Sequence, residues 1–240
     1  MIDKYLLKKI NFYLKKKNNK LICIDGITCS GKSYFSNILF KYLKVKNKNV
    51  HLISKDLFLL SRNKRIKLLK KFINQVNYNQ DILHYDQKKI KKIIYAIRNN
   101  KKIILRGLYD RNSGNNNKQM VFNFQKSNII IFEGLYSLKN FEKNLKDTYK
   151  ILIQENIYIS LIRKIKRIRD KKISIQNVIS EFTNLHLSSY YNYLKKFKFN
   201  IHIELSNKKF VKSNLDKKKQ IIFIKSFQNK HLFKKKFNEK

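Results

Sequence analysis

The stretch "GITCSGKSYF", residues 26–35, directly follows a short apolar run, "LICID", residues 21–25. It matches the template G-x-x-x-x-G-K-[ST], although the whole chain contains only five glycines. Residues 21–24 are typical of a buried strand, and residues 34–43 place apolar side chains at helical spacing. Because strand, loop and helix follow in this order, the stretch predicts a phosphate-binding loop.

The fixed positions of this loop each have a chemical reason. Glycines let the backbone turn its N–H groups toward phosphate oxygens, and Lys32 adds a mobile positive charge. The hydroxyl of Ser33 is suited to coordinate Mg²⁺. We therefore expect ATP or GTP to bind at Gly26, Ile27, Thr28, Cys29, Ser30, Gly31, Lys32, Ser33 and Tyr34.

The length of 240 residues suits one α/β domain of ordinary size. The first ten residues, "MIDKYLLKKI", have neither the apolar core nor the cleavage site of a secretory signal, and no apolar run is as long as a membrane span. Cys23 and Cys29 lack metal-ligand spacing, which fits a reducing compartment. We expect a cytoplasmic protein with no membrane partner.

The formal net charge of +41 is a feature of nucleic-acid-binding proteins, but its distribution favours another interpretation. Lysines occur almost everywhere along the chain, and no single dense stripe stands out apart from the tail after residue 207. Such a pattern is typical of a solvated surface, so we expect no specific nucleic-acid partner.

The hydrophobic pattern divides the chain into an amphipathic helix at 1–19, a main domain at 20–206 and a basic extension at 207–240. In the first helix, Tyr5, Leu6, Ile10 and Tyr13 are expected on the buried side. Further buried strands are expected at 49–54, 128–134, 149–154 and 199–205. Helices are expected at 87–99, 157–170 and 174–195, and a hairpin at 101–124. The expected fold is a parallel β-sheet flanked by helices.

Two carboxylates follow the ends of predicted strands: Asp56 comes after 49–54, and Glu133 ends 128–134. The carboxyl ends of parallel strands gather at one edge of the sheet, where ligands bind. Both acids should therefore lie near the phosphate loop. The alternative is that they are solvated loop acids or helix caps.

Together these motifs resemble those of the uridine kinase family, a branch of P-loop kinases that includes phosphoribulokinase and bacterial pantothenate kinase. The similarity covers about residues 20–205. It rests on five stretches in order: "GITCSGKS", "ISKDLF", "LYDRNSG", "IIIFEG" and "LIRKIKRIRD". The resemblance implies a nucleoside-kinase-like fold with a β-hairpin over the acceptor site and a helical lid.

The resemblance also implies roles for individual residues. Asp56 would take the proton of the acceptor hydroxyl and help to order Mg²⁺, which Ser33 would bind directly and Glu133 through water. Lys32 would hold the β- and γ-phosphates. The lid arginines would be Arg163 and Arg167, whereas a shifted alignment uses Arg169 and Asp170.

The acceptor side matches the family less closely. The stretch "NYNQDILHYD", residues 77–86, is a loose counterpart of the family's N-F-D-H-P-D, and Gly107 stands where the family often has proline. ATP use is therefore better supported than uridine as the substrate. The expected acceptor-binding residues are Asp81, with Asp86 as its competitor, His84, Tyr109 and Arg111.

With the resemblance, these residues imply a Mg²⁺-dependent kinase that transfers the γ-phosphoryl group of ATP or GTP to the 5′-hydroxyl of uridine or cytidine. One alternative is a sister kinase acting on a sugar phosphate, pantothenate or a vitamin riboside. Another is a nucleotide-gated nucleic-acid-binding protein without useful catalysis. The sequence leaves both a monomer and a homo-oligomer open.

Overall fold

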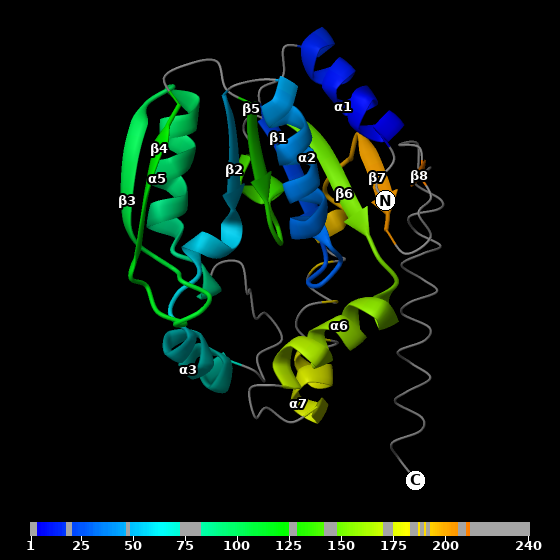
Figure 1. Ribbon diagram of the computed structural model, residues 1–240. Coiled ribbons are helices and arrows are strands. Elements are labelled where there is room, and N and C mark those ends of the chain that lie inside the picture. Colours follow the sequence, from blue (N-terminus) through cyan, green and yellow to red (C-terminus); the bar gives the residue numbers. More distant parts are fainter. Residues whose placement is uncertain are drawn as a thin grey trace.

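The computed structural model describes residues 4–17, 21–46, 49–72, 83–124, 129–141, 148–169, 175–182, 187, 190, 193–205 and 210–211. Its centre is a six-stranded sheet with the strand order β2-β5-β1-β6-β7-β8 (Figure 1). These strands are β1 (Leu21–Gly26), β2 (Val50–Ser54), β5 (Ile129–Glu133), β6 (Thr148–Gln154), β7 (Ile201–Glu204) and β8 (Phe210–Val211). All neighbours are parallel except β7 and β8, which are antiparallel. The expected parallel sheet is confirmed, and β8 was not predicted.

Helices cover both faces of the sheet, as the apolar runs of its strands require. Along β1, Ile22 and Ile24 lie in one apolar cluster, together with α1 (Lys4–Lys17) and α2 (Lys32–Lys46). Cys23 points to the opposite face, which packs against α5 (Gln87–Arg98) and apolar residues that follow α7 (Ile175–Ser180). The central strand is thus shielded from solvent on both sides.

The first helix belongs to one of these clusters. Leu6, Leu7, Ile10 and Leu14 are buried in it, and the ring centroid of Tyr13 lies 4.3 Å from that of Tyr149. The expectation for Tyr5 is wrong, because this side chain is 66% exposed. Each helical residue advances by about 100°, so Tyr5 lies on the side of the helix opposite the Leu7–Ile10–Leu14 face.

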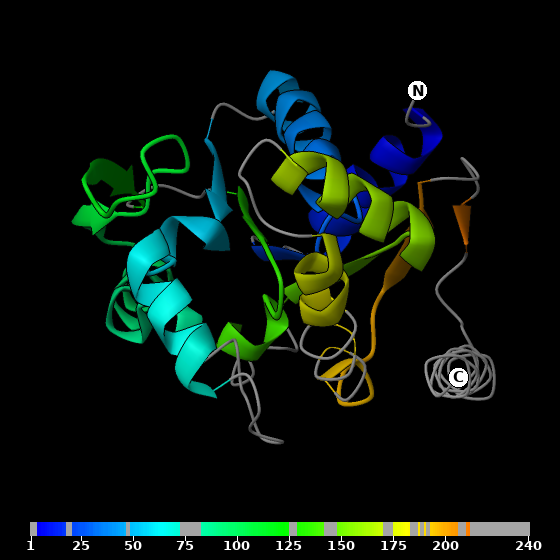
Figure 2. The ribbon, with the colours of Figure 1, turned by 90° about the horizontal axis from the view of Figure 1, so that it is seen from below.

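The expected hairpin is confirmed as a separate antiparallel pair, β3 (Lys102–Leu108) and β4 (Lys118–Asn123). It lies with α5 beside β2 (Figure 1). The remaining elements are η1 (Lys55–Phe58), α3 (Arg62–Phe72) and α6 (Ile157–Arg169). Seen from below, α6 and α7 lie in front of the edge where the parallel strands end (Figure 2). Of the helix expected at 174–195, the structure describes α7 and only single residues or short segments beyond it.

Within the described ranges, no helix has both the length and the apolar character needed to cross a membrane. Of the predicted basic extension at 207–240, the structure describes only β8. The division of the chain at residues 19 and 206 stays a prediction.

His202 on β7 makes the stability of this fold depend on pH. The side chain is 2% exposed, and its Nδ1 atom has no hydrogen-bond partner among the described residues. Burial lowers the pKa of His202 from 6.5 to about 4. The unfolded chain therefore binds a proton before the folded chain does, and the free energy of unfolding decreases as the pH falls from 6.5 to about 4. This contribution is at most about 3 kcal/mol.

We predict that His202→Leu removes this titration. The free energy of unfolding, measured by urea denaturation, should then fall less steeply between pH 6.5 and pH 4 than in the unmodified protein. Equal slopes in the two proteins would contradict the assignment to His202.

Candidate active site

The phosphate loop leaves the central strand and enters α2. Cys29 and Gly31 have positive φ angles of 61° and 94°, with Ser30 between them. Left-handed residues that alternate with others form a concave backbone nest, which is suited to binding anions. The ammonium group of Lys32 donates a hydrogen bond of 2.7 Å to the carbonyl oxygen of Ile27, so this side chain folds back across the loop.

Space requires glycine at position 26, and the positive φ angle favours it at position 31. A Cβ atom on Gly26 would lie 2.6 Å from the carbonyl oxygen of Ile153 on β6. A Cβ atom on Gly31 would lie 2.5 Å from a methyl group of Leu205, just after β7. The hydroxyl of Ser30 is buried in the same loop and has no hydrogen-bond partner within the described chain. The loop is therefore a tight cradle with an unused polar group, which fits a phosphate ligand.

Strand register brings Glu133 to the phosphate loop. Glu133 is level with Ile24 on one neighbouring strand and with Ser54 on the other. The hydroxyl of Ser33 donates a hydrogen bond of 3.3 Å to the carboxylate of Glu133. Asp56 follows in η1, directly after β2, and its side chain is 47% exposed. The structure thus gathers both carboxylates at the edge expected from the sequence.

Charges at this edge affect one another. Burial lowers the pKa of Lys32, while the nearby carboxylates of Glu133, Asp25 and Asp56 act in the opposite direction. Burial raises the pKa of Glu133, and the charge of Asp56 raises it further. Hydrogen bonds and the charge of Lys32 oppose this rise. Lys32, Glu133 and Asp56 therefore form a coupled set of charges, which would respond strongly to an added anion or metal ion.

The oxygen atoms of Ser33, Asp56 and Glu133 are hard ligands of the kind that Mg²⁺ prefers. Among the residues that the structure describes, no group of three or more His, Cys, Asp or Glu side chains is arranged to hold a metal ion. Mg²⁺ commonly binds through one or two carboxylates together with water and substrate phosphates. The residues present therefore fit a Mg²⁺ ion that arrives with a nucleotide.

The helix α6 contacts the phosphate loop through Arg163. Its guanidinium donates to the carbonyl oxygen of Cys29 at 3.4 Å and to the carboxylate of Glu155 at 2.8 Å. The Glu155 side chain is fully buried, so it holds the arginine in place. Arg167 is exposed, and Arg169 ends the helix with a side chain outside the described part. Arg163 is therefore the expected lid arginine that lies at the loop, and the second lid position stays a prediction.

Two of the acceptor-side residues, Tyr109 and Arg111, follow the end of β3. The hydroxyl of Tyr109 accepts a hydrogen bond of 2.8 Å from Arg65, and its ring is buried. Arg111 reaches Asp56, with 3.6 Å between its Nη2 atom and the carboxylate oxygen. His84 is also buried, and its carbonyl oxygen accepts from the backbone N–H of Leu60. Arg111 thus contacts a carboxylate at the sheet edge.

Of the two aspartates expected on the acceptor side, Asp86 lies within the described residues and Asp81 does not. Asp86 caps α5: its carboxylate accepts from the backbone N–H of Lys89 at 3.1 Å and pairs with the ammonium group of the same residue at 3.0 Å. Asp81 lies outside the described residues. Acceptor binding by either residue stays a prediction.

Sequence reasoning missed Asp25, the residue before the loop. This carboxylate is fully buried and accepts hydrogen bonds from five groups. The donors are Gly26 N at 2.8 Å, Ser137 Oγ at 3.2 Å, Leu138 N at 3.4 Å, Tyr190 Oη at 3.2 Å and Tyr193 Oη at 2.5 Å. The signal was present in the sequence, because an acid at the end of a buried apolar strand must have partners.

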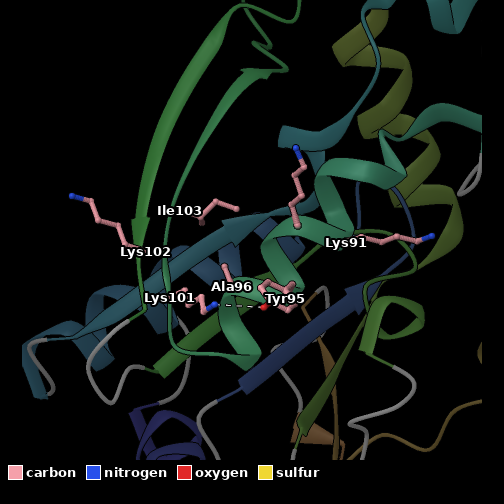
Figure 3. Close-up of a pocket in the computed structure, with 7 residues that line it drawn as sticks. Lys91, Tyr95, Ala96, Lys101, Lys102 and Ile103 are labelled. Carbon is pink, nitrogen blue, oxygen red and sulfur yellow. Dashed lines mark hydrogen bonds between the residues drawn. The ribbon is translucent and has the colours of Figure 1, made fainter.

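A pocket of about 400 Å³ lies apart from this site, between α5 and β3 (Figure 3). Tyr95, Ala96 and Ile103 line it together with lysine side chains, and it shares no residue with the loop or the strand ends. The ammonium group of Lys101 lies 3.5 Å from the hydroxyl of Tyr95. Because lysines occur on most of this surface, their presence here does not mark a site.

The parallel sheet, the nest after its central strand and the helix that contacts the nest define the fold of a P-loop kinase. Solved structures support this class. D-glycerate 3-kinase from Cryptococcus neoformans matches with a TM-score of 0.59 and 12% identity, over 87% of this chain and 98% of that one. A possible uridine kinase from Bacillus stearothermophilus matches with a TM-score of 0.52 and 16% identity, over 80% and 92%.

YFH7 from Saccharomyces cerevisiae, proposed to be a P-loop kinase with a circular permutation, matches with a TM-score of 0.60 and 13% identity, over 84% of this chain and 98% of that one. No family model and no curated protein sequence matches the chain. The structural neighbours are thus uridine kinase-like and related P-loop kinases, in agreement with the resemblance of the motifs. At these identities the likeness is one of fold.

We predict that Tyr193→Phe destabilises the protein by about 1.5–3 kcal/mol, because it removes a hydrogen bond to a buried charged group. The same hydroxyl also accepts from the backbone N–H of Leu138 at 3.1 Å. Urea denaturation measures the loss. The matched control is Tyr95→Phe, on an exposed tyrosine, which should change stability by less than about 0.5 kcal/mol. Equal effects of the two substitutions would contradict a stabilising role for the Asp25 cluster.

We predict that Glu133→Gln reduces the loss of stability at high pH. Because burial raises the pKa of Glu133 above its ordinary value of 4.5, the unfolded chain releases this proton first. The free energy of unfolding therefore decreases as the pH rises above 4.5, and glutamine does not titrate. Urea denaturation from pH 4 to pH 8 should show the variant gaining stability relative to the unmodified protein. Parallel pH profiles would exclude Glu133 as the cause.

Proposed function

We propose that this protein is a Mg²⁺-dependent kinase that transfers the γ-phosphoryl group of ATP or GTP to a hydroxyl of a small molecule. The observation that carries the proposal is the meeting of Lys32, Ser33 and Glu133 at the end of the central strand, with Asp56 beside them. A protein that only binds a nucleotide needs the phosphate cradle. It does not need a partly exposed carboxylate where an acceptor would enter.

In the proposed reaction, Asp56 accepts the proton of the acceptor hydroxyl. The hydroxyl oxygen forms a bond to the γ-phosphorus, and the bond from that phosphorus to the oxygen of the β-phosphate breaks. The products are the phosphorylated acceptor and a nucleoside diphosphate. A positioned carboxylate orients the attacking oxygen, while surrounding cations carry most of the charge stabilisation.

Two side-chain cations that contact the phosphate loop, Lys32 and Arg163, would stabilise the transferring phosphoryl group. Lys32 would hold the β- and γ-phosphates from inside the loop, and Arg163 is already in contact with the loop backbone. Ser33, Asp56 and Glu133 would hold Mg²⁺, directly or through water. When bound, the ion neutralises charge on the β- and γ-phosphates. Because Glu133 is buried and its pKa is raised, a neighbouring cation would also favour its ionised form.

The motifs suggest the 5′-hydroxyl of uridine or cytidine as the acceptor, in pyrimidine salvage. Such a kinase of free small molecules would act in the cytoplasm. A second candidate is another small alcohol, and the contact between Arg111 and Asp56 favours one that carries an anionic group. Tyr109 favours an acceptor without a base, because its buried ring and its hydrogen bond to Arg65 leave little surface on which a base could stack.

A nucleotide-gated protein that binds nucleic acid is the alternative of another class. The lysine-rich surface would serve it, but the carboxylate of Asp56 would repel a phosphate backbone at the sheet edge. Steep salt dependence of RNA affinity, with no phosphoryl transfer to any alcohol, would favour that alternative.

We predict that Asp56→Asn lowers kcat by about 10²–10⁴-fold while the KM for ATP changes little, because the base acts on the acceptor. Lys32→Ala should raise the KM for ATP and abolish the thermal shift given by a nonhydrolysable ATP analogue. Lys41→Ala, at an exposed position on α2, is the matched control and should leave both unchanged. Formation of nucleoside diphosphate measures turnover. Full activity of Asp56→Asn would exclude it as the base.

A further inference from the structure

Arginines are rare and unevenly placed in this chain, which has 48 lysines and eight arginines. Three of them, Arg163, Arg167 and Arg169, lie on α6, which contacts the phosphate loop. Arg62 and Arg65, on α3, contact the loop that follows β3, and this loop carries Arg111 beside Asp56. Lysine supplies a point charge, whereas the planar fork of arginine binds carboxylate and phosphate in a bidentate manner. Two of these arginines lie beside a carboxylate: Arg163 pairs with Glu155, and Arg111 lies next to Asp56.

Two of the acceptor-side arginines brace the segment that carries the third. Arg65 donates from Nε to the carbonyl oxygen of Leu60 at 2.9 Å and from Nη2 to the hydroxyl of Tyr109. Arg62 donates to the carbonyl oxygen of Arg111 at 3.4 Å. The guanidinium of Arg62 also packs against Gly114, where an added Cβ would lie 2.9 Å from its Cζ atom. The backbone of Arg111 is therefore held in place.

The side chain of Arg111 is bound less tightly than its backbone. It is 64% exposed and lies 3.6 Å from Asp56, which is longer than a good charged hydrogen bond. An exposed pair of this kind adds little stability, so it can be exchanged for a ligand at low cost. An acceptor whose hydroxyl reached Asp56 would bring its neighbouring atoms against this guanidinium. A neutral acceptor would leave the guanidinium without a new partner.

We infer that the acceptor carries a carboxylate or phosphate group, which Arg111 binds while the reacting hydroxyl lies at Asp56. This inference rests on the proposed kinase function and names its substrate class. The 3.6 Å between Asp56 and Arg111, with one hydrogen bond at each end, places the hydroxyl oxygen and the anionic oxygen within about 9 Å of each other. Small hydroxy acids and sugar phosphates meet this condition.

The test compares acceptors in matched pairs with the full chain, ATP and Mg²⁺. Glycerate is compared with its neutral amide, ribose 5-phosphate with ribose, and uridine and cytidine serve as neutral nucleosides. Formation of nucleoside diphosphate measures turnover. At least one anionic acceptor should have a kcat/KM at least 10-fold above that of its neutral counterpart, and the pair that responds distinguishes a carboxylate from a phosphate.

Variants assign the preference to one residue. Arg111→Ala should raise the KM for the anionic acceptor by about 10–100-fold, with the KM for ATP unchanged and a much smaller change in the KM for the neutral counterpart. Arg111→Lys should recover part of the loss, because a point charge replaces a fork. Arg106→Ala, an exposed arginine on β3 of the same hairpin, is the matched control and should leave all constants unchanged. Thermal unfolding shows whether each variant is folded.

The outcomes separate this inference from the proposed function. Transfer to uridine or cytidine in preference to every anionic alcohol, or an unchanged KM in Arg111→Ala, overturns the anionic acceptor and leaves the kinase standing. Absence of transfer to any alcohol overturns the kinase, and the inference falls with it. If Arg106→Ala raised the KM for the anionic acceptor as much as Arg111→Ala does, the effect would come from the general charge of the hairpin. That result would also overturn the inference.

Discussion

Asp25 ends the central strand with a carboxylate that no solvent reaches, and the geometry of the site depends on how it is held. Its partners come from three places: the first residue of the phosphate loop, the segment after Glu133 and the tyrosines that follow α7. A buried charge is tolerated only when it is hydrogen-bonded, and removing one hydrogen-bond donor costs about 1.5–3 kcal/mol. The carboxylate therefore fixes three segments relative to one another. Burial, with the charge of Asp25, raises the pKa of Tyr193, so its hydroxyl remains a donor.

Next to this junction, the edge of the sheet combines the buried Lys32 with carboxylates that differ in their exposure. Glu133 is shielded and hydrogen-bonded by Ser33, whereas Asp56 is half-exposed beside Arg111. The shielded acid suits a metal ion that arrives with phosphate, and the exposed acid suits an acceptor that enters from solvent. Two groups of the same chemistry thus obtain different surroundings because one ends an internal strand and the other follows an edge strand.

Local patterns predicted the sheet, the hairpin and the phosphate loop, because each is encoded by neighbouring residues. The placement of Glu133 at the loop also followed from the sequence, since parallel strands end at one edge. The Asp25 cluster could not be predicted, because Tyr190 and Tyr193 lie 165 and 168 residues away in the sequence. The face of α1 was misjudged at Tyr5, an aromatic residue whose neighbours Leu6 and Leu7 both turn inward. Asp86 matched a binding motif loosely, and its local use is as a helix cap.

Leu205 has a consequence for the order in which the site is assembled. Its methyl group forms a wall against Gly31, although the two residues are separated by most of the chain. The strands that flank the central one, β5 and β6, also follow it by more than a hundred residues. Long-range pairings of this kind form late, and a chain emerging from the ribosome folds from its N-terminus onward. The phosphate loop is thus synthesised first but gains this support only after β7 has been made, so nascent chains that stop before β7 would carry the motif without a finished nucleotide site.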